Sequence, residues 1–120
     1  MNQETSIQRR IMLALSKAGC IVWRNETGAA HVGKVIYKKG RQVTLDNAQM
    51  LPFGLCRGSS DIIGLCPRGR FLAVEVKTPT GRATKEQLNF IAQVKAKGGI
   101  AGIARSVEDA LGLLQQEAGS

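Results

Sequence analysis

The chain has 120 residues and 17 Lys and Arg against 9 Asp and Glu, which gives a formal net charge of +8. This length predicts one domain over residues 1–120, and 43% hydrophobic with 22% charged residues is typical of a folded globular chain. No apolar run approaches the ~20 residues that span a bilayer, and the N-terminus lacks the layout of a signal peptide. Membrane, secreted and fibrous classes are therefore excluded, and a soluble cytoplasmic protein is expected.

The net charge predicts the kind of partner, and the cysteines argue against two kinds of structural site. The positive excess predicts an anionic partner, with nucleic acid first and a basic housekeeping domain as the alternative. Four basic residues fall within eight positions that hold no acid: Lys34, Lys38, Lys39 and Arg41. Cys20, Cys56 and Cys66 are odd in number and form no CxxC pair, which argues against a disulfide framework or a zinc site. Cys20 and Cys66 lie in apolar runs and are predicted to be small core residues.

The first half of the chain predicts a helix, a strand and a hairpin. Apolar residues from Ile7 to Ala18 recur at helical spacing, and Gly19 is a good stop, so a helix is expected over residues 3–19. The segments that follow are a short strand over 20–23, a loop over 25–33, a hairpin of strands 35–37 and 42–45 with a basic tip, and an irregular connection over 46–60.

The second half alternates strands and helices. The strongest strand predictions are residues 61–66 and 71–77, and a loop follows over 78–82. Thr84 with Gln87 forms a capping-box pattern that opens a helix to about Lys97. A strand over 100–104 and a helix from Ser106 complete the chain. This order predicts an α/β fold with a central mixed sheet flanked by helices.

Two of the scarce acids lie in the two strongest strands. Asp61 opens one strand, and Glu75 is embedded in the other. The run Cys66-Pro67-Arg68-Gly69 predicts a three-residue hairpin loop, a type I turn followed by a left-handed Gly. This loop places Asp61 directly opposite Glu75, with Lys77 on the same face. A two-residue loop would shift the register by one and separate the carboxylates.

Facing carboxylates repel each other and raise one pKa unless a cation neutralises them. Oxygen ligands of this kind suit Mg²⁺ or Mn²⁺, which leave positions for water and phosphate. Such a metal can polarise a phosphodiester, and Lys77 could stabilise the developing charge. The alternative is an ordinary cross-strand acid–lysine pair, because Asp-x13-Glu-x-Lys occurs often by chance.

Glu4 and Gln87 are polar residues that share a predicted helix face with apolar residues. Glu4 precedes Ile7 and Ile11 at helical spacing and could face the sheet. The favoured alternative is a first-turn acid that complements the helix dipole. Gln87 shares a face with Ile91, and its alternative role is the capping box.

Asp61, Glu75-Val76-Lys77 and the order of elements resemble the PD-(D/E)XK nuclease superfamily, and more narrowly the VRR-NUC (virus-type replication-repair nuclease) domain. The resemblance runs from Glu4 to about Ala110. Ser60 stands where the superfamily usually has a Pro before the Asp. Its most specific stretches are Trp23-Arg24-Asn25 with Gly28, Gly58-Ser59-Ser60-Asp61-Ile62-Ile63-Gly64, Ala73-Val74-Glu75-Val76-Lys77 and Thr84-Lys85-Glu86-Gln87.

The resemblance implies a restriction-endonuclease-like core in which Asp61, Glu75 and the main-chain carbonyl of Val76 bind the metal and Lys77 is catalytic. It also implies a helix-1 acid, matched by Glu4, and a supporting Gln87. Stand-alone members from phages and bacteria are implied to be homodimers that cut four-way DNA junctions.

The leading hypothesis is a Mg²⁺- or Mn²⁺-dependent DNA endonuclease selective for branched double-stranded DNA, a Holliday junction resolvase. The alternatives are a flap, nicking or RNA endonuclease on the same site, and a non-catalytic nucleic-acid-binding module. The residues expected to contact nucleic acid, mostly at backbone phosphates, are the basic hairpin residues above with Arg24, Arg57, Ser59, Ser60 and Arg82.

Overall fold

The computed structural model describes residues 2–116 of the chain. The chain divides into two compact units, which we name the core unit, Met1–Asn25 with Arg57–Ser120, and the hairpin unit, Glu26–Cys56. One domain over residues 1–120 stays a prediction, and residues 1 and 117–120 lie outside the described part. No helix within residues 2–116 is long and apolar enough to cross a membrane.

A four-stranded mixed sheet forms the centre of the core unit. Its strands are β1 (Ile21–Arg24), β4 (Ile62–Cys66), β5 (Arg70–Val76) and β6 (Ile100–Ala104), in the spatial order β1-β4-β5-β6. β1, β4 and β5 are antiparallel neighbours, whereas β6 runs parallel to β5. The parallel step needs a crossover, which the helix α2 (Lys85–Ala96) provides. The predicted α/β class and central mixed sheet are confirmed.

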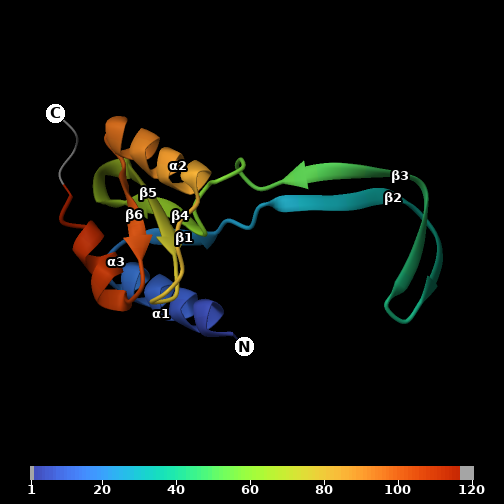
Figure 1. Cartoon of the computed structure of the whole chain (residues 1–120), viewed down its shortest axis with the longest axis horizontal. Coiled ribbons are helices and arrows are strands. Elements are labelled where there is room, and N and C mark those ends of the chain that lie inside the picture. Colours follow the sequence, from blue (N-terminus) through green and yellow to red (C-terminus); the bar gives the residue numbers. More distant parts are fainter. Residues whose placement is uncertain (1, 117–120) are drawn as a thin grey trace. The chain divides into compact units, whose positions relative to one another are not determined.

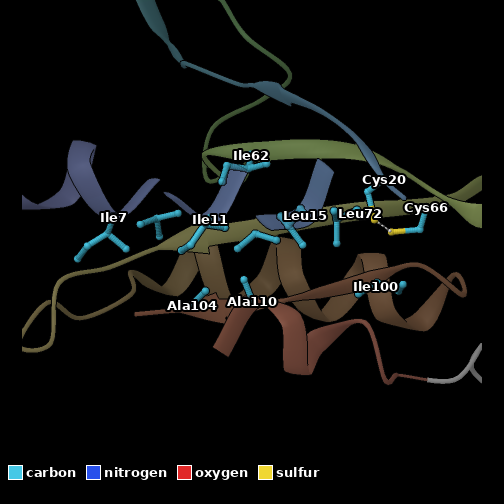
Figure 2. Packing of buried hydrophobic residues seen from close by; sticks show 12 residues of the cluster. Ile7, Ile11, Leu15, Cys20, Ile62, Cys66, Leu72, Ile100, Ala104 and Ala110 are labelled. Atoms are coloured by element: carbon cyan, nitrogen blue, oxygen red, sulfur yellow. Dashed lines mark hydrogen bonds between the residues drawn. The ribbon is translucent and has the colours of Figure 1, made fainter. Parts of the chain in front are cut away.

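Helices cover both faces of this sheet. α1 (Gln3–Lys17) and α3 (Val107–Leu113) lie on one face and α2 lies on the other (Figure 1). The α1 face is the main core, in which side chains of β5 meet side chains of α1 (Figure 2). The members from these two elements are Ile7, Ile11, Leu15, Leu72, Val74 and Val76.

The smaller core lies on the α2 face, where Ala73 packs with Ile91. Alternate residues of a strand point to opposite faces, so Glu75 shares the α2 face with Ala73. The predicted separation of the apolar and carboxylate-bearing faces of β5 is confirmed.

The turn between β4 and β5 sets the register of the two strands. Cys66 pairs with Arg70 and Ile62 with Val74, as predicted. The connection Pro67–Gly69 is a short 3₁₀ turn in which Arg68 has a φ of 69° and Gly69 a φ of 76°. The predicted conformation, with Gly69 alone in the left-handed region, is therefore wrong at Arg68. The predicted loop length is right, and it is the loop length that fixes the register.

The hairpin unit is a long two-stranded ribbon. β2 (Gly28–Lys39) and β3 (Gln42–Phe53) pair antiparallel around a tight turn in which Gly40 has a φ of 59° (Figure 1). The register shifts twice along the ribbon, between Val32 and Lys34 and between Val35 and Tyr37. The predicted basic hairpin is confirmed. The predicted loop over 25–33 is wrong from residue 28 onward, and the predicted irregular connection over 46–60 is wrong up to residue 53, because these segments belong to the ribbon.

Candidate active site

The register of β4 and β5 brings Asp61 and Glu75 together on the α2 face. Asp61 lies one residue before β4, and its Oδ2 accepts a hydrogen bond from the main-chain N–H of Val76 at 2.9 Å. Glu75 lies within β5, where the residue is only 2% exposed. A carboxylate so deeply buried is costly unless polar or charged partners surround it.

The partners of Glu75 satisfy one of its two oxygens. Oε1 accepts a hydrogen bond from Nε2 of Gln87 at 3.1 Å and lies 3.7 Å from Nζ of Lys77. Oε2 is buried and has no hydrogen-bond partner among the described residues. A buried oxygen without a partner costs free energy, so this atom is suited to a ligand that the protein itself does not supply.

The electrostatics of Glu75 also favour a bound ligand, and specifically a cation. Burial raises the pKa of Glu75 to about 8, and the negative charge of Asp61 adds to the increase. Lys77 lowers this pKa, whereas Glu4 raises it. One lysine thus fails to compensate for the carboxylates around it. A divalent cation would supply the missing positive charge.

Gln87 performs both of the roles considered for it. It is the third residue of α2, where its Oε1 accepts from the main-chain N–H of Thr84 at 2.8 Å. The hydroxyl of Thr84 accepts in return from the main-chain N–H of Gln87, which completes a capping box. The side-chain Nε2 remains to donate to Glu75. The cap therefore fixes which end of the amide faces the carboxylate.

Asn25 holds the segment that leads into Asp61. Its buried Nδ2 donates to the hydroxyl of Ser59 at 2.8 Å and to the main-chain carbonyl of Ser60 at 2.9 Å. Its main-chain N–H donates to the carbonyl of Asp61 at 2.7 Å. The sequence predicted no separate role for Asn25, although this residue belongs to one of the stretches that carry the family resemblance.

Ser59 and Ser60 are themselves buried, with exposed fractions of 7% and 0%. The hydroxyl of Ser59 faces Asn25. A direct contact of either hydroxyl with nucleic acid therefore finds no support in the structure, and both residues belong to the support of Asp61.

Arg105 fixes the loop that follows Lys77. Its Nη1 donates to the carbonyls of Thr78 at 2.5 Å and Gly81 at 2.6 Å. The main-chain N–H of Lys77 donates to the carbonyl of Ala104, the residue before Arg105. Sequence reasoning missed Arg105, and no pattern distinguished it from the other arginines.

Glu4 lies on the other side of the sheet from Gln87, in the exposed first turn of α1. Its charge still raises the pKa of Glu75, so α1 brings this acid within electrostatic range of the site. The same position suits the positive end of the helix dipole. The two roles considered for Glu4 are therefore compatible.

The available donors fit a hard divalent cation. Residues 2–116 contain no group of three His, Cys, Asp or Glu side chains close enough together to hold a metal ion. The site instead offers the carboxylates of Asp61 and Glu75, including the unpartnered Oε2, and the family resemblance implies the main-chain carbonyl of Val76 as a further oxygen donor. Oxygen donors few in number suit Mg²⁺ or Mn²⁺, which keep several waters.

The predicted nucleic-acid contacts divide between the two units. Arg24, Arg57 and Arg82 are exposed on the core unit, where Nη2 of Arg24 donates to Oε1 of Gln8 at 3.0 Å. The other four are exposed on the distal half of the hairpin unit: Lys34, Lys38, Lys39 and Arg41.

Comparison with known proteins agrees with the observed fold. The family model described as the VRR-NUC domain matches residues 2–108. A solved structure described as a VRR_NUC domain matches with a TM-score of 0.59 and 17% sequence identity, over 97% of this chain and 98% of that one. At this identity the structural match shows the fold. A search of curated proteins found no match.

Proposed function

Because the chain belongs to the VRR-NUC family, and is thus a nuclease-type domain, we propose that it is a Mg²⁺- or Mn²⁺-dependent DNA endonuclease whose preferred substrate is a four-way junction. Nucleases of this family are generally dependent on divalent metals. The observation that carries the proposal is the buried, unpartnered Oε2 of Glu75 beside Asp61 and Lys77.

The protein groups have separate tasks in phosphodiester hydrolysis. Asp61 and Glu75 would hold the cation with the carbonyl of Val76, and Gln87 keeps Glu75 oriented. When bound there, a divalent cation would supply Lewis-acid chemistry, polarising the phosphodiester and lowering the pKa of the attacking water. Lys77, whose Nζ lies 3.7 Å from Oε1 of Glu75, would stabilise the charge that develops on the phosphate.

The surface charge supports a backbone-binding mode. Exposed Arg24, Arg57 and Arg82 on the core unit and the basic residues of the hairpin unit provide contacts to phosphates, which position a duplex without reading its sequence. Aromatic residues make up 4% of the chain, which favours duplex backbone over single strands bound by base stacking. A homodimer would supply two related sites for paired incision of a symmetric junction.

The decisive experiment compares synthetic four-way, flap and linear duplexes and a structured RNA, each with Mg²⁺, Mn²⁺ or a chelator. We expect the junction to be cut fastest, only with metal, and in paired strands. Equal cutting of linear duplex would overturn junction selectivity, and preferential cutting of a flap or of RNA would replace it with those activities. Light scattering during chromatography tests the homodimer.

Substitution of the site separates catalysis from binding. Asp61→Asn, Glu75→Gln and Lys77→Ala should each lower the cleavage rate by about 10²-fold or more, while the junction is still bound. Glu108→Gln and Lys95→Ala, at exposed positions of other elements, are the matched controls. A chain that binds junctions but never cuts them, with Asp61→Asn unchanged in every respect, would establish a non-catalytic binding module instead.

A further inference from the structure

The core unit places two cysteines side by side at the end of β4 remote from Asp61. Ile21 pairs with Leu65, so Cys20 and Cys66 are the next opposite residues of the β1–β4 ladder. Their Sγ atoms lie 3.0 Å apart, and the two residues are 5% and 7% exposed (Figure 2). Both cysteines are free thiols in the structure.

We propose that Cys20 and Cys66 form a reversible disulfide bond, a redox modification site within the core unit. Directly opposite residues of antiparallel strands have Cβ atoms ~4.5–5.5 Å apart, and a disulfide needs ~3.5–4.5 Å with sulfurs at ~2.05 Å. The approach required is therefore about 1 Å. Both residues lie at strand ends, where Gly19 precedes one and the turn Pro67–Gly69 follows the other.

The chemistry is thiol–disulfide exchange with a low-molecular-weight disulfide, RSSR. One protein thiolate attacks a sulfur of RSSR and releases RS⁻, which leaves a mixed disulfide on the protein. The second cysteine loses its proton and attacks the protein sulfur of that mixed disulfide, which releases the second RS⁻. The two cysteines lose two protons and two electrons, and RSSR becomes two RSH.

The surroundings of the two sulfurs affect their protonation and their access to a reactant. Burial raises the pKa of Cys66 to about 12, and the neighbouring Cys20 adds to this increase. Cys66 thus remains a protonated thiol near neutral pH and can donate to the sulfur of Cys20. A cavity of about 570 Å³, lined by both cysteines with Arg68 and Arg70, gives an anionic disulfide a route to the pair.

The modification does not depend on the proposed nuclease activity. The cysteines are 46 positions apart, and the bond would close a loop that contains β1, the hairpin unit and β4. Restriction of the unfolded chain by a loop of this size predicts a melting temperature higher by roughly 10 °C in the oxidised protein.

The test uses the Cys56→Ser chain, because Cys56 is exposed and would otherwise react on its own. This chain is equilibrated in buffers of increasing ratio of oxidised to reduced glutathione, then alkylated and weighed by mass spectrometry. We expect loss of two hydrogen atoms with both thiols protected from alkylation, full reversal by reductant, and the higher melting temperature. Two free thiols at every ratio, or stable glutathione adducts on both cysteines, would overturn the proposal.

Single-cysteine variants test the mixed-disulfide step. In the same background, Cys66→Ser should accumulate a glutathione adduct at Cys20, and Cys20→Ser should accumulate one at Cys66. Absence of both adducts in folded variants would contradict the mixed-disulfide route. The mass measurement on the Cys56→Ser chain decides the disulfide itself, even where a single-cysteine variant does not fold.

Discussion

Gln87 connects the start of a helix to the most buried acid of the site. Its carbonyl oxygen belongs to the capping box with Thr84, and its amide nitrogen belongs to Glu75. The capping box thereby removes the ambiguity of which amide end faces the carboxylate. Gln87 acts on the chemistry through Glu75 and is thus a positioning residue.

Gln87→Glu separates these two functions. The substituted carboxylate still accepts from Thr84, but it offers a second negative charge to Glu75 where a donor stood. We expect the metal-dependent cleavage rate to fall by at least tenfold while the melting temperature changes by only a few degrees. Gln93→Glu, an exposed position on the same helix, is the control. Equal activity of both variants would show that the hydrogen bond to Glu75 has no catalytic consequence.

Asn25→Ala tests the support of Asp61. The substitution leaves the carbonyl of Ser60 and the hydroxyl of Ser59 without this buried donor. We expect the free energy of unfolding to fall by about 1–3 kcal/mol in urea titrations. Metal affinity, measured by calorimetry on the folded variant, should fall as well. Asn89→Ala on exposed α2 is the control. Unchanged metal affinity would limit Asn25 to a structural role.

The sequence was sufficient for the strand pair that carries the site and insufficient for its supports. Loop length and alternation were enough to set Asp61 opposite Glu75, because both are local properties of one hairpin. Asn25 and Arg105 act on segments 34 and 24 to 27 positions away. Such interactions depend on how β1 and β6 pack beside the β4–β5 strand pair, and local sequence patterns do not encode this packing.

At the scale of elements, the ribbon of β2 and β3 was the least predictable part. Gly28, Gly33 and Pro52 interrupt its strands, and these residues ordinarily indicate loops. Its side chains are exposed almost throughout, so no face imposes an alternation of apolar and polar residues. A two-stranded ribbon also has no central strand, which is why Pro52 is tolerated opposite Ala29.

Neutralising the ribbon should weaken DNA binding without harm to the fold. Replacing Lys34, Lys38, Lys39 and Arg41 with Gln should weaken junction binding and reduce the slope of log affinity against log salt by up to ~3–4, about 0.9 for each phosphate that the protein no longer neutralises. The matched control replaces the exposed Arg9, Lys17, Lys95 and Lys97 of the core unit. Fluorescence anisotropy over a salt series measures both. Equal slopes for the two variants would mean that net charge alone governs binding.

At the scale of the whole molecule, the charge of the candidate site is opposite in sign to the net charge of the chain. The chain carries a net charge of +8, yet its most buried ionisable site is acidic. The positive surface suits the anionic polymer proposed as substrate, while the proposed metal site would place a small cation beside the buried Glu75. The two proposed ligands, which have opposite charges, would bind at different places: the polymer at the surface and the cation at the buried carboxylate.

The buried Glu75 makes stability depend on pH in the metal-free protein. The folded-state pKa of Glu75 is raised from 4.5 to about 8, so the folded chain binds its proton more tightly than the unfolded chain does. The resulting stabilisation is complete below pH 4.5 and is lost as pH rises through about 8. In chelator, the natural chain should lose more stability between pH 6 and 9 than Glu75→Gln does. Urea titrations measure the difference, and parallel pH profiles would contradict it.

The alternation of β5 has a consequence for how the protein tolerates variation. Leu72, Val74 and Val76 face the main core, whereas Glu75 faces the site and Lys77 follows directly after the strand. In a library of all single substitutions, scored separately for protein abundance and for cleavage, neighbouring positions should therefore fail for different reasons. Substitutions of Val74 and Val76 would lower protein abundance, because they disrupt the core. Substitutions of Glu75 and Lys77 would leave abundant protein that does not cleave DNA. Along this one segment, positions needed for folding would therefore alternate with positions needed for cleavage.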